Sequence, residues 1–319
     1  MNGSNVRPSA SATTRSNGTD RERGTVTIPI LLDTDIGSDI DDAVALAYLL
    51  SHPDAELVGV TTVTGNTEER AACAAALCAA ARADVPIHAG LSGPLHDGPG
   101  QPHVPQYATI TETVPAAPPG HRDAIEFMRD TICARPSEIE LLTIGPLTNV
   151  AVLFALDPEI PSLLRGMTSM AGWYFAERPT VVEWNIVVDP MAAAIAFRHA
   201  PRRHTCVGID VTRGLCLDRA EIEDRFARTP LLRVVLDMAQ VFFREADHIT
   251  FHDPLAAAIV FEPGLCRFET GDVTIDVTPT SAGPCFTRFT SNPAGAARAA
   301  TAVDGDRFFA EYFCRTIPD

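Results

Sequence analysis

Five aspartates lie within residues 33–42, which read DTDIGSDIDD. They are Asp33, Asp35, Asp39, Asp41 and Asp42. Their carboxylates would repel one another strongly unless a positive charge lay nearby. Helix capping is one interpretation, because aspartates at a helix start accept from free backbone N–H groups, but it leaves Asp33 and Asp35 unexplained. A hard divalent cation such as calcium or magnesium would compensate the whole cluster, so the loop predicts a metal site.

Three further segments carry polar side chains of the kinds that catalytic sites use. Residues 183–185 read Glu-Trp-Asn and lead into Asp-Pro at 189–190, residues 252–254 read His-Asp-Pro, and residues 145–149 read Gly-Pro-Leu-Thr-Asn. Each has an ordinary structural interpretation, because Asp-Pro starts helices and Gly-Pro suits a turn before a helix. Taken singly, these segments do not predict a function.

The elements that must position these residues follow a regular alternation. Apolar runs typical of buried strands cover 27–32, 57–63, 139–144 and 205–211, and runs typical of helices cover 40–50, 68–83, 148–156 and 190–199. This alternation predicts an α/β fold with a mostly parallel sheet and helices on both faces. The acidic loop then follows the carboxyl end of the first strand, where open α/β sheets bind ligands.

The alternation weakens after residue 218, where helical segments precede two expected antiparallel edge strands at 273–277 and 285–289 and a closing helix at 306–314. No repeat or Pro/Gly-rich linker divides residues 27–319, so we predict one domain there. Residues 1–26 are rich in Ser, Asn, Thr, Gly and Arg, which predicts a disordered tail. The Pro/Gly-rich stretch 90–120 predicts a long loop.

Composition excludes several classes of function. The chain has 41 acidic against 25 basic residues in 319, a net charge of −16, which disfavours nucleic acid polymers and acidic membranes. No run reaches the roughly 20 apolar residues of a membrane span, and we expect a cytoplasmic protein because no signal peptide is evident. The eight cysteines lack C-x-x-C spacing, so we expect reduced thiols, mostly in the core.

In this order and spacing, the acidic loop and the three further segments resemble the inosine-uridine-preferring nucleoside hydrolase family. The resemblance extends over residues 28–316 and includes Thr-Thr-Val-Thr-Gly-Asn at 61–66 and Asp-Gly-Asp-Arg-Phe-Phe at 304–309. It implies an open, mostly parallel, Rossmann-like α/β sheet, one calcium ion at its carboxyl edge, and homodimers or homotetramers. The implied activity is hydrolysis of ribonucleosides, or of a related N-riboside, to ribose and free base.

The resemblance also implies roles for single residues. Asp35, Asp42 and Asp253 would ligate calcium together with the backbone carbonyl of Ile144, and a water and two ribose hydroxyls would complete the coordination. Asp33 would lie behind these ligands and orient them. The residues that would bind the sugar are Asp41, Asn66, Glu183 and Asn185.

The chemistry of the reaction agrees with these roles. Cleavage passes through a ribose with oxocarbenium character and then needs a water at C1′. Calcium would lower the pKa of that water, Asp35 would accept its proton, and the acidic pocket would favour the cationic sugar. No side chain is an obvious covalent nucleophile, which predicts an inverting displacement. His252 is the best candidate for the acid that protonates the leaving base.

The sequence departs from the family pattern in three places. The acidic loop is two residues longer than the shortest family version, which adds Asp39, but its Asp41-Asp42-Ala43 ending matches the family and favours Asp41 as the sugar contact. The family's Gly-Asn pair, whose Asn holds the 5′-hydroxyl, is absent from 173–179, which read Trp-Tyr-Phe-Ala-Glu-Arg-Pro. The long loop also lacks the family's His/Gly-rich segment, so no base preference is predicted.

Two alternative functions fit parts of the sequence. Asp33-Thr34-Asp35 has the D-x-D form of a magnesium-dependent haloacid-dehalogenase-like phosphatase, but that reaction needs a downstream lysine, and the basic residues here are arginines. A non-catalytic sensor of nucleosides or ribose would keep the pocket without turnover. The presence of Asp35 and of all side-chain ligands argues against the sensor.

Overall fold

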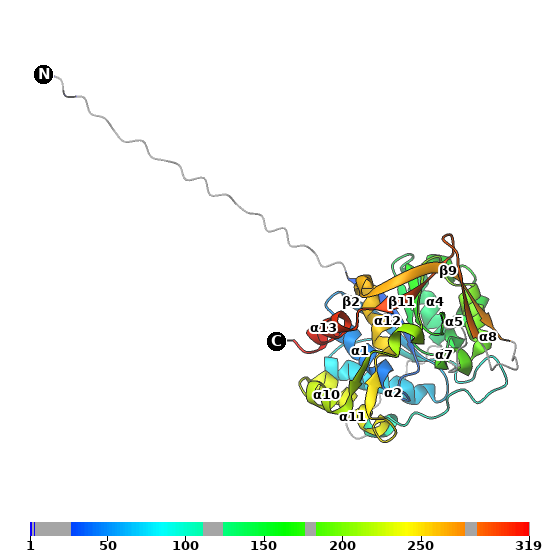
Figure 1. The fold of residues 1–319 in the computed structure, drawn as a ribbon, viewed down its shortest axis with the longest axis horizontal. Helices are drawn as coiled ribbons and strands as arrows, with labels where there is room; N and C mark the ends of the chain where they lie inside the picture. Colours follow the sequence, from blue (N-terminus) through cyan, green and yellow to red (C-terminus); the bar gives the residue numbers. More distant parts are fainter. Residues whose placement is uncertain (2, 4–26, 111–123, 176–182, 278–285, 319) are drawn as a thin grey trace.

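A central sheet organises the computed structural model, which describes residues 1, 3, 27–110, 124–175, 183–277 and 286–318 (Figure 1). Its strands lie in the order β10-β9-β11-β6-β5-β4-β1-β2-β3. The seven strands from β11 to β3 are parallel, whereas β9 and β10 pair antiparallel at one edge. Their bounds are β1 Ile28–Thr34, β2 Ala55–Thr62, β3 Ile87–Ala89, β4 Glu140–Thr143, β5 Gly166–Met170, β6 His204–Val207, β9 Cys266–Asp276, β10 Phe286–Ser291 and β11 Ala297–Val303. Two short strands, β7 Cys216–Asp218 and β8 His248–Thr250, form a separate antiparallel pair.

Helices cover both faces of the sheet (Figure 1). On one face α1, α2, α11, α12 and α13 pack in a hydrophobic cluster with Ile30 and Leu32, and on the other face α4, α5 and α8 pack with Leu31. This alternation along β1 is the period of two expected for a strand buried on both sides. The helices are α1 Asp41–Ser51, α2 Thr67–Ala81, α3 Tyr107–Ile110, α4 Ala124–Ala134, α5 Thr148–Leu156, α6 Ile160–Leu163, α7 Trp184–Val188, α8 Pro190–Arg198, α9 Ile209–Thr212, α10 Arg219–Phe226, α11 Pro230–Phe242, α12 His252–Phe261 and α13 Gly305–Thr316, with a 3₁₀ turn at Pro263–Leu265.

The chain reverses its direction of travel across the sheet between β1 and β4. The run β3-β2-β1-β4-β5-β6 is the order of doubly wound dinucleotide-binding sheets, and Asp33 of β1 pairs in register with Thr143 of β4. After β1 the chain enters α1 on one face, and after β4 it enters α5 on the other face. Because the two connections diverge, a crevice is expected at the carboxyl ends of these strands.

The structure confirms the predicted mostly parallel α/β sheet with helices on both faces, and the helix expected at 148–156 is α5. One strand was predicted too long, because β6 ends at Val207 and α9 begins at Ile209. The antiparallel strand expected at 273–277 is the end of the longer β9. The predicted tail, apart from residues 1 and 3, lies outside the described residues, as do Cys285 and positions 111–120 of the long loop.

Two properties of the described residues bear on earlier expectations. No helix among them is long and apolar enough to cross a membrane. The seven cysteines that the structure describes are all free thiols.

Candidate active site

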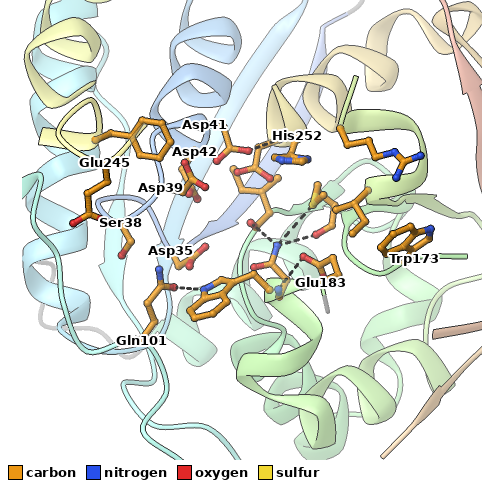
Figure 2. A pocket seen from close by; sticks show the side chains of 18 residues that line it. Asp35, Ser38, Asp39, Asp41, Asp42, Gln101, Trp173, Glu183, Glu245 and His252 are labelled. Carbon is orange, nitrogen blue, oxygen red and sulfur yellow. Dashed lines mark hydrogen bonds between the residues drawn. The ribbon is translucent and has the colours of Figure 1, made fainter. Parts of the chain in front are cut away.

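A cavity of about 580 Å³ opens at the carboxyl edge of the sheet, at the crevice between β1 and β4 (Figure 2). It is lined by residues from the acidic loop, from the ends of β4 and β5, and from the starts of α7 and α12. The predicted site residues on its wall are Asp35, Asp41, Asp42, Ile144, Glu183, Asn185, His252 and Asp253. Side chains more than 200 positions apart in the sequence therefore meet at one site.

Three carboxylates form the centre of this cavity. Oxygen atoms of Asp41, Asp42 and Asp253 all lie within 4.8 Å of one another, and all three side chains are buried. Burial, followed by mutual repulsion, raises the pKa of each carboxyl well above its usual range. Asp41 Oδ2 accepts the backbone N–H of Asp253 at 3.2 Å, and Asp42 accepts the hydroxyl of Thr34. A cluster of buried oxygen donors with uncompensated negative charge fits a hard cation.

Asp35 lies on the same wall, outside that three-residue cluster. A Cβ atom at Gly145 would come within 2.8 Å of the Asp35 backbone nitrogen and 2.9 Å of its Oδ1, so glycine is needed where the β4 connection passes the acidic loop. Burial raises the pKa of Asp35 to about 6, although Arg70 opposes this shift. At neutral pH the Asp35 carboxylate is therefore mostly ionised and can accept a proton.

Arg70 fixes the acidic loop from beneath, a role that sequence reasoning missed. Its guanidinium, on a fully buried side chain, donates to the carbonyls of Asp35 and Ile36, to Thr64 O at 2.7 Å and to Gln101 O at 3.0 Å. It thus joins the loop after β1, the loop after β2 and the long loop. The only signal in the sequence is a lone arginine at the start of the alanine-rich α2.

Asp33 lies beneath the cavity, and its hydrogen bonds link the end of β1 to the end of β2 and to the start of α5. Its Oδ1 accepts Thr61 Oγ1 at 2.6 Å and Asn149 Nδ2 at 2.8 Å, while its Oδ2 is buried without a hydrogen-bond partner in the described part of the chain. Burial raises the pKa of Asp33 to about 7. Asn149 also donates to Thr62 O at 3.0 Å and accepts from Leu91 N at 2.9 Å. The segment 145–149 thus positions the acidic loop.

Glu183 and Asn185 form the wall opposite the acidic loop. Glu183 caps α7 and accepts three backbone N–H groups, from Gly172 at 2.8 Å, Asn185 at 2.9 Å and Ile186 at 3.0 Å. Burial nevertheless raises the pKa of Glu183 to about 7. Asn185 Nδ2 donates to Ile144 O and Met170 O, both at 2.9 Å. Because a carbonyl oxygen has two lone pairs, Ile144 O can still accept a second partner.

His252 lies beside the carboxylates at the start of α12. Its Nδ1 is 2.6 Å from Thr212 Oγ1, and that hydroxyl oxygen is 3.3 Å from Gly208 O. Either the Thr212 hydroxyl donates to Nδ1, or a protonated Nδ1 donates to that hydroxyl and leaves Nε2 as the acceptor of the neutral ring. Burial lowers the pKa of His252 to about 4, so the imidazole is neutral at neutral pH. Action as an acid requires a higher pKa, so this role stays a prediction.

Asn66 is the one predicted site residue that is not on the cavity wall. Its side chain is exposed, and its Oδ1 accepts the Glu69 backbone N–H at 3.2 Å as the N-cap of α2. The sequence contained this signal, because Asn followed three residues later by Glu is a helix-start pattern. The sugar contact of Asn66 stays a prediction.

The chain has two tryptophans, and both line the cavity. Trp184 is half exposed, and its Nε1 donates to Gln101 Oε1 of the long loop at 2.9 Å (Figure 2). Trp173 is the first residue of the stretch 173–179, and the guanidinium of Arg213 lies 5.7 Å from its ring centroid. Residues 176–179 of that stretch lie outside the described residues.

Comparisons with known proteins agree with this architecture and site. The profile of the family "Inosine-uridine preferring nucleoside hydrolase" matches residues 30–310. A probable uridine nucleosidase 1 from Oryza sativa is 30% identical over 77% of this chain and 81% of its own length. An inosine-uridine preferring nucleoside hydrolase from Crithidia fasciculata is 32% identical over 78% of this chain and 84% of its own length.

The fold also matches a solved plant nucleoside hydrolase with a TM-score of 0.79, covering 92% of this chain and 99% of that one at 23% identity. The family profile spans most of the chain and includes the four segments whose residues meet at the cavity. This chain belongs to the inosine-uridine preferring nucleoside hydrolase family and is an N-glycosyl hydrolase of ribonucleosides.

Proposed function

We propose that this hydrolase depends on calcium and uses Asp35 as the general base that activates the attacking water. The observation that carries the proposal is the buried cluster of Asp41, Asp42 and Asp253 beside Asp35 in one cavity. Four carboxylates so placed are costly to bury unless a cation compensates them.

The residues that would hold calcium are Asp35, Asp42, Asp253 and the carbonyl of Ile144. All four offer oxygen atoms, the donors that calcium prefers, and the Ile144 carbonyl keeps a free lone pair beside Asn185. Bound calcium would lower the pKa of a water and orient it. Asp41 belongs to the carboxylate cluster too, so it can contact both the cation and a ribose hydroxyl.

The protein groups around the cavity suit cleavage of an N-riboside. Asp35 accepts the proton of the attacking water, because its pKa of about 6 leaves it mostly ionised at neutral pH. Asp41, Glu183 and Asn185 hold the ribose, and the surrounding negative charge stabilises the oxocarbenium-like sugar. Water attacks from the side of the acidic loop, which inverts the configuration at C1′.

His252 is proposed to contact the leaving base. In the tautomer whose Nδ1–H donates to Thr212, its Nε2 can accept an N–H of the base, and the protonated ring can donate from Nε2. Base preference is left open in this proposal, because the relatives' names differ between uridine alone and inosine with uridine.

Release of reducing sugar from a panel of nucleosides, with calcium present and after chelation, tests the proposal. We expect ribose release that stops on chelation and returns with calcium. Binding of nucleosides without ribose release would favour the sensor. A phosphatase is disfavoured because Asp33, its required nucleophile, is fully buried and bonded to Thr61 and Asn149. Cytoplasmic location and homo-oligomeric assembly stay predictions.

A further inference from the structure

A second cavity, of about 520 Å³, lies at the amino ends of β1, β4, β5 and β6, away from the carboxyl edge that forms the active site. Four arginines line it, namely Arg165, Arg202, Arg203 and Arg298, and we name it the arginine cavity. We infer that the arginine cavity binds a small phosphomonoester. This inference does not depend on the hydrolase activity or on calcium.

The arginines of this cavity have one acidic neighbour, Glu140: burial raises the pKa of its carboxyl group, and the charges of Arg203, Arg165 and Arg298 oppose that shift. Among the described residues, Arg165, Arg202 and Arg203 form no ion pair and donate no side-chain hydrogen bond; Arg298 donates to Thr205 Oγ1 at 2.8 Å. Several arginines elsewhere form ion pairs, as Arg228 does with Asp224 on α10. In a chain with 41 acidic and 25 basic residues, four arginines around one cavity with a single carboxylate would attract an anion.

Glu140 is the one acidic side chain on the described wall of the arginine cavity, and it does not balance the arginines. It is buried and accepts Thr168 Oγ1 at 2.8 Å. A Cβ atom at Gly166 would lie 2.7 Å from Glu140 Oε2, so the glycine makes room for the carboxyl group. One carboxylate against four guanidinium groups leaves a positive excess.

The chemistry of the wall favours a phosphate ester over a bare ion. Guanidinium groups bind phosphate oxygens through paired N–H donors. Ile259, Val260 and Phe261, at the end of α12, provide an apolar side that can contact the organic part of an ester. The volume is typical of small-molecule sites. Phosphate borne on a sugar or on a nucleoside shares this chemistry.

Calorimetric titration of the full-length protein tests the inference, with ribose 5-phosphate, AMP and sulfate as probes and ribose as the control without phosphate. Ionic strength is held constant, because exposed charge pairs are screened by salt. We expect saturable binding of at least one ester, at least fivefold tighter than the binding of sulfate. Ribose, which has no phosphate, should not bind at this cavity. Whichever ester binds more tightly identifies the organic part.

Arginine variants locate the binding. Arg165→Gln/Arg203→Gln should weaken ester binding at least tenfold, whereas the control Arg129→Gln/Arg228→Gln, two exposed surface arginines, should change it less than twofold. If the first variant does not fold, the exposed Arg202→Gln alone should weaken binding about threefold. The inference would be overturned if no ester bound saturably, or if both double variants bound the ester equally. It would also be overturned if the arginine variant changed the sedimentation coefficient of a protein that binds no ester.

Discussion

The two ends of the parallel sheet carry cavities of opposite charge. At the carboxyl edge, Asp35, Asp41, Asp42 and Asp253 face one cavity; at the amino edge four arginines surround another. Helix α12 connects the two, because Asp253 in its first turn lines the acidic cavity and its last residues line the arginine cavity. The helix dipole is positive at the first end and negative at the second, so it favours the charge found at each.

The helix dipole provides only part of the electrostatic stabilisation that the charges at each end require. It contributes about 0.3–1 kcal/mol per charge, far less than the cost of burying several like charges together. Arg70 is a buried positive charge near the acidic cavity, but its guanidinium donates its hydrogen bonds to backbone carbonyls and not to the carboxylates. The comparison therefore supports the two proposals of a ligand of opposite sign at each end, a cation at one and an anion at the other.

The largest expected effect is at the carboxyl edge. Asp35→Ala should lower kcat by at least about 10³-fold, because it removes the general base and a cation ligand. Asp39→Ala is the matched control: this aspartate of the same loop also lines the cavity, but it is not a proposed ligand or base, and it accepts the backbone N–H of Ile40 at 2.6 Å. The control should keep kcat within about tenfold of wild type. Equal losses in steady-state ribose release would contradict the assignment.

Removing the cation should also destabilise the acidic end. Calcium at 100 times its dissociation constant would add about 2.7 kcal/mol to the free energy of unfolding, since it binds only the folded state. Thermal unfolding with calcium and with chelator measures this difference. The Asp253→Asn variant should respond much less to calcium, and an unchanged response would count against that ligand.

Arg70 tests how the acidic loop is held. Arg70→Met should lower the free energy of unfolding by about 3 kcal/mol, because four backbone carbonyls lose a buried charged donor. Arg129→Met, which breaks an exposed pair with Asp157, should cost less than about 1 kcal/mol. Urea unfolding in saturating calcium compares the two, and similar costs would mean that Arg70 is not structural.

His204 makes the amino end sensitive to acid. Burial lowers its pKa to about 3, so the unfolded chain binds a proton below about pH 6.5 that the folded chain does not, and stability falls as pH falls. Between pH 6.5 and 5 this residue should cost the wild type about 2 kcal/mol. His204→Asn should reduce the slope of unfolding free energy against pH in saturating calcium. The exposed His199→Gln is the control, and identical slopes in both variants would contradict the account.

The smallest expected effect concerns the cavity mouth. Trp184→Phe removes the N–H that Gln101 accepts and should raise KM about threefold with kcat unchanged. Steady-state kinetics measures both constants. A fall in kcat instead would place Trp184 closer to the reacting bond.

The sequence predicted best where signals are local. The β1 and β2 strands and the α1, α2 and α5 helices follow from apolar patterns, and the acidic loop from its density of aspartates. β5, which reads GMTSM, and the alanine-rich β11 have no such pattern and were missed. Arg70 and the arginine cavity were missed because their partners are distant in sequence, and a lone arginine does not reveal which way it points.

Calcium in a crystal tests the central claim most directly. Crystals grown with calcium and measured for its anomalous scattering should show one strong peak at the carboxyl edge, in contact with oxygens of Asp35, Asp42, Asp253 and the Ile144 carbonyl. A peak elsewhere, or no peak while ribose is still released after chelation, would contradict the account.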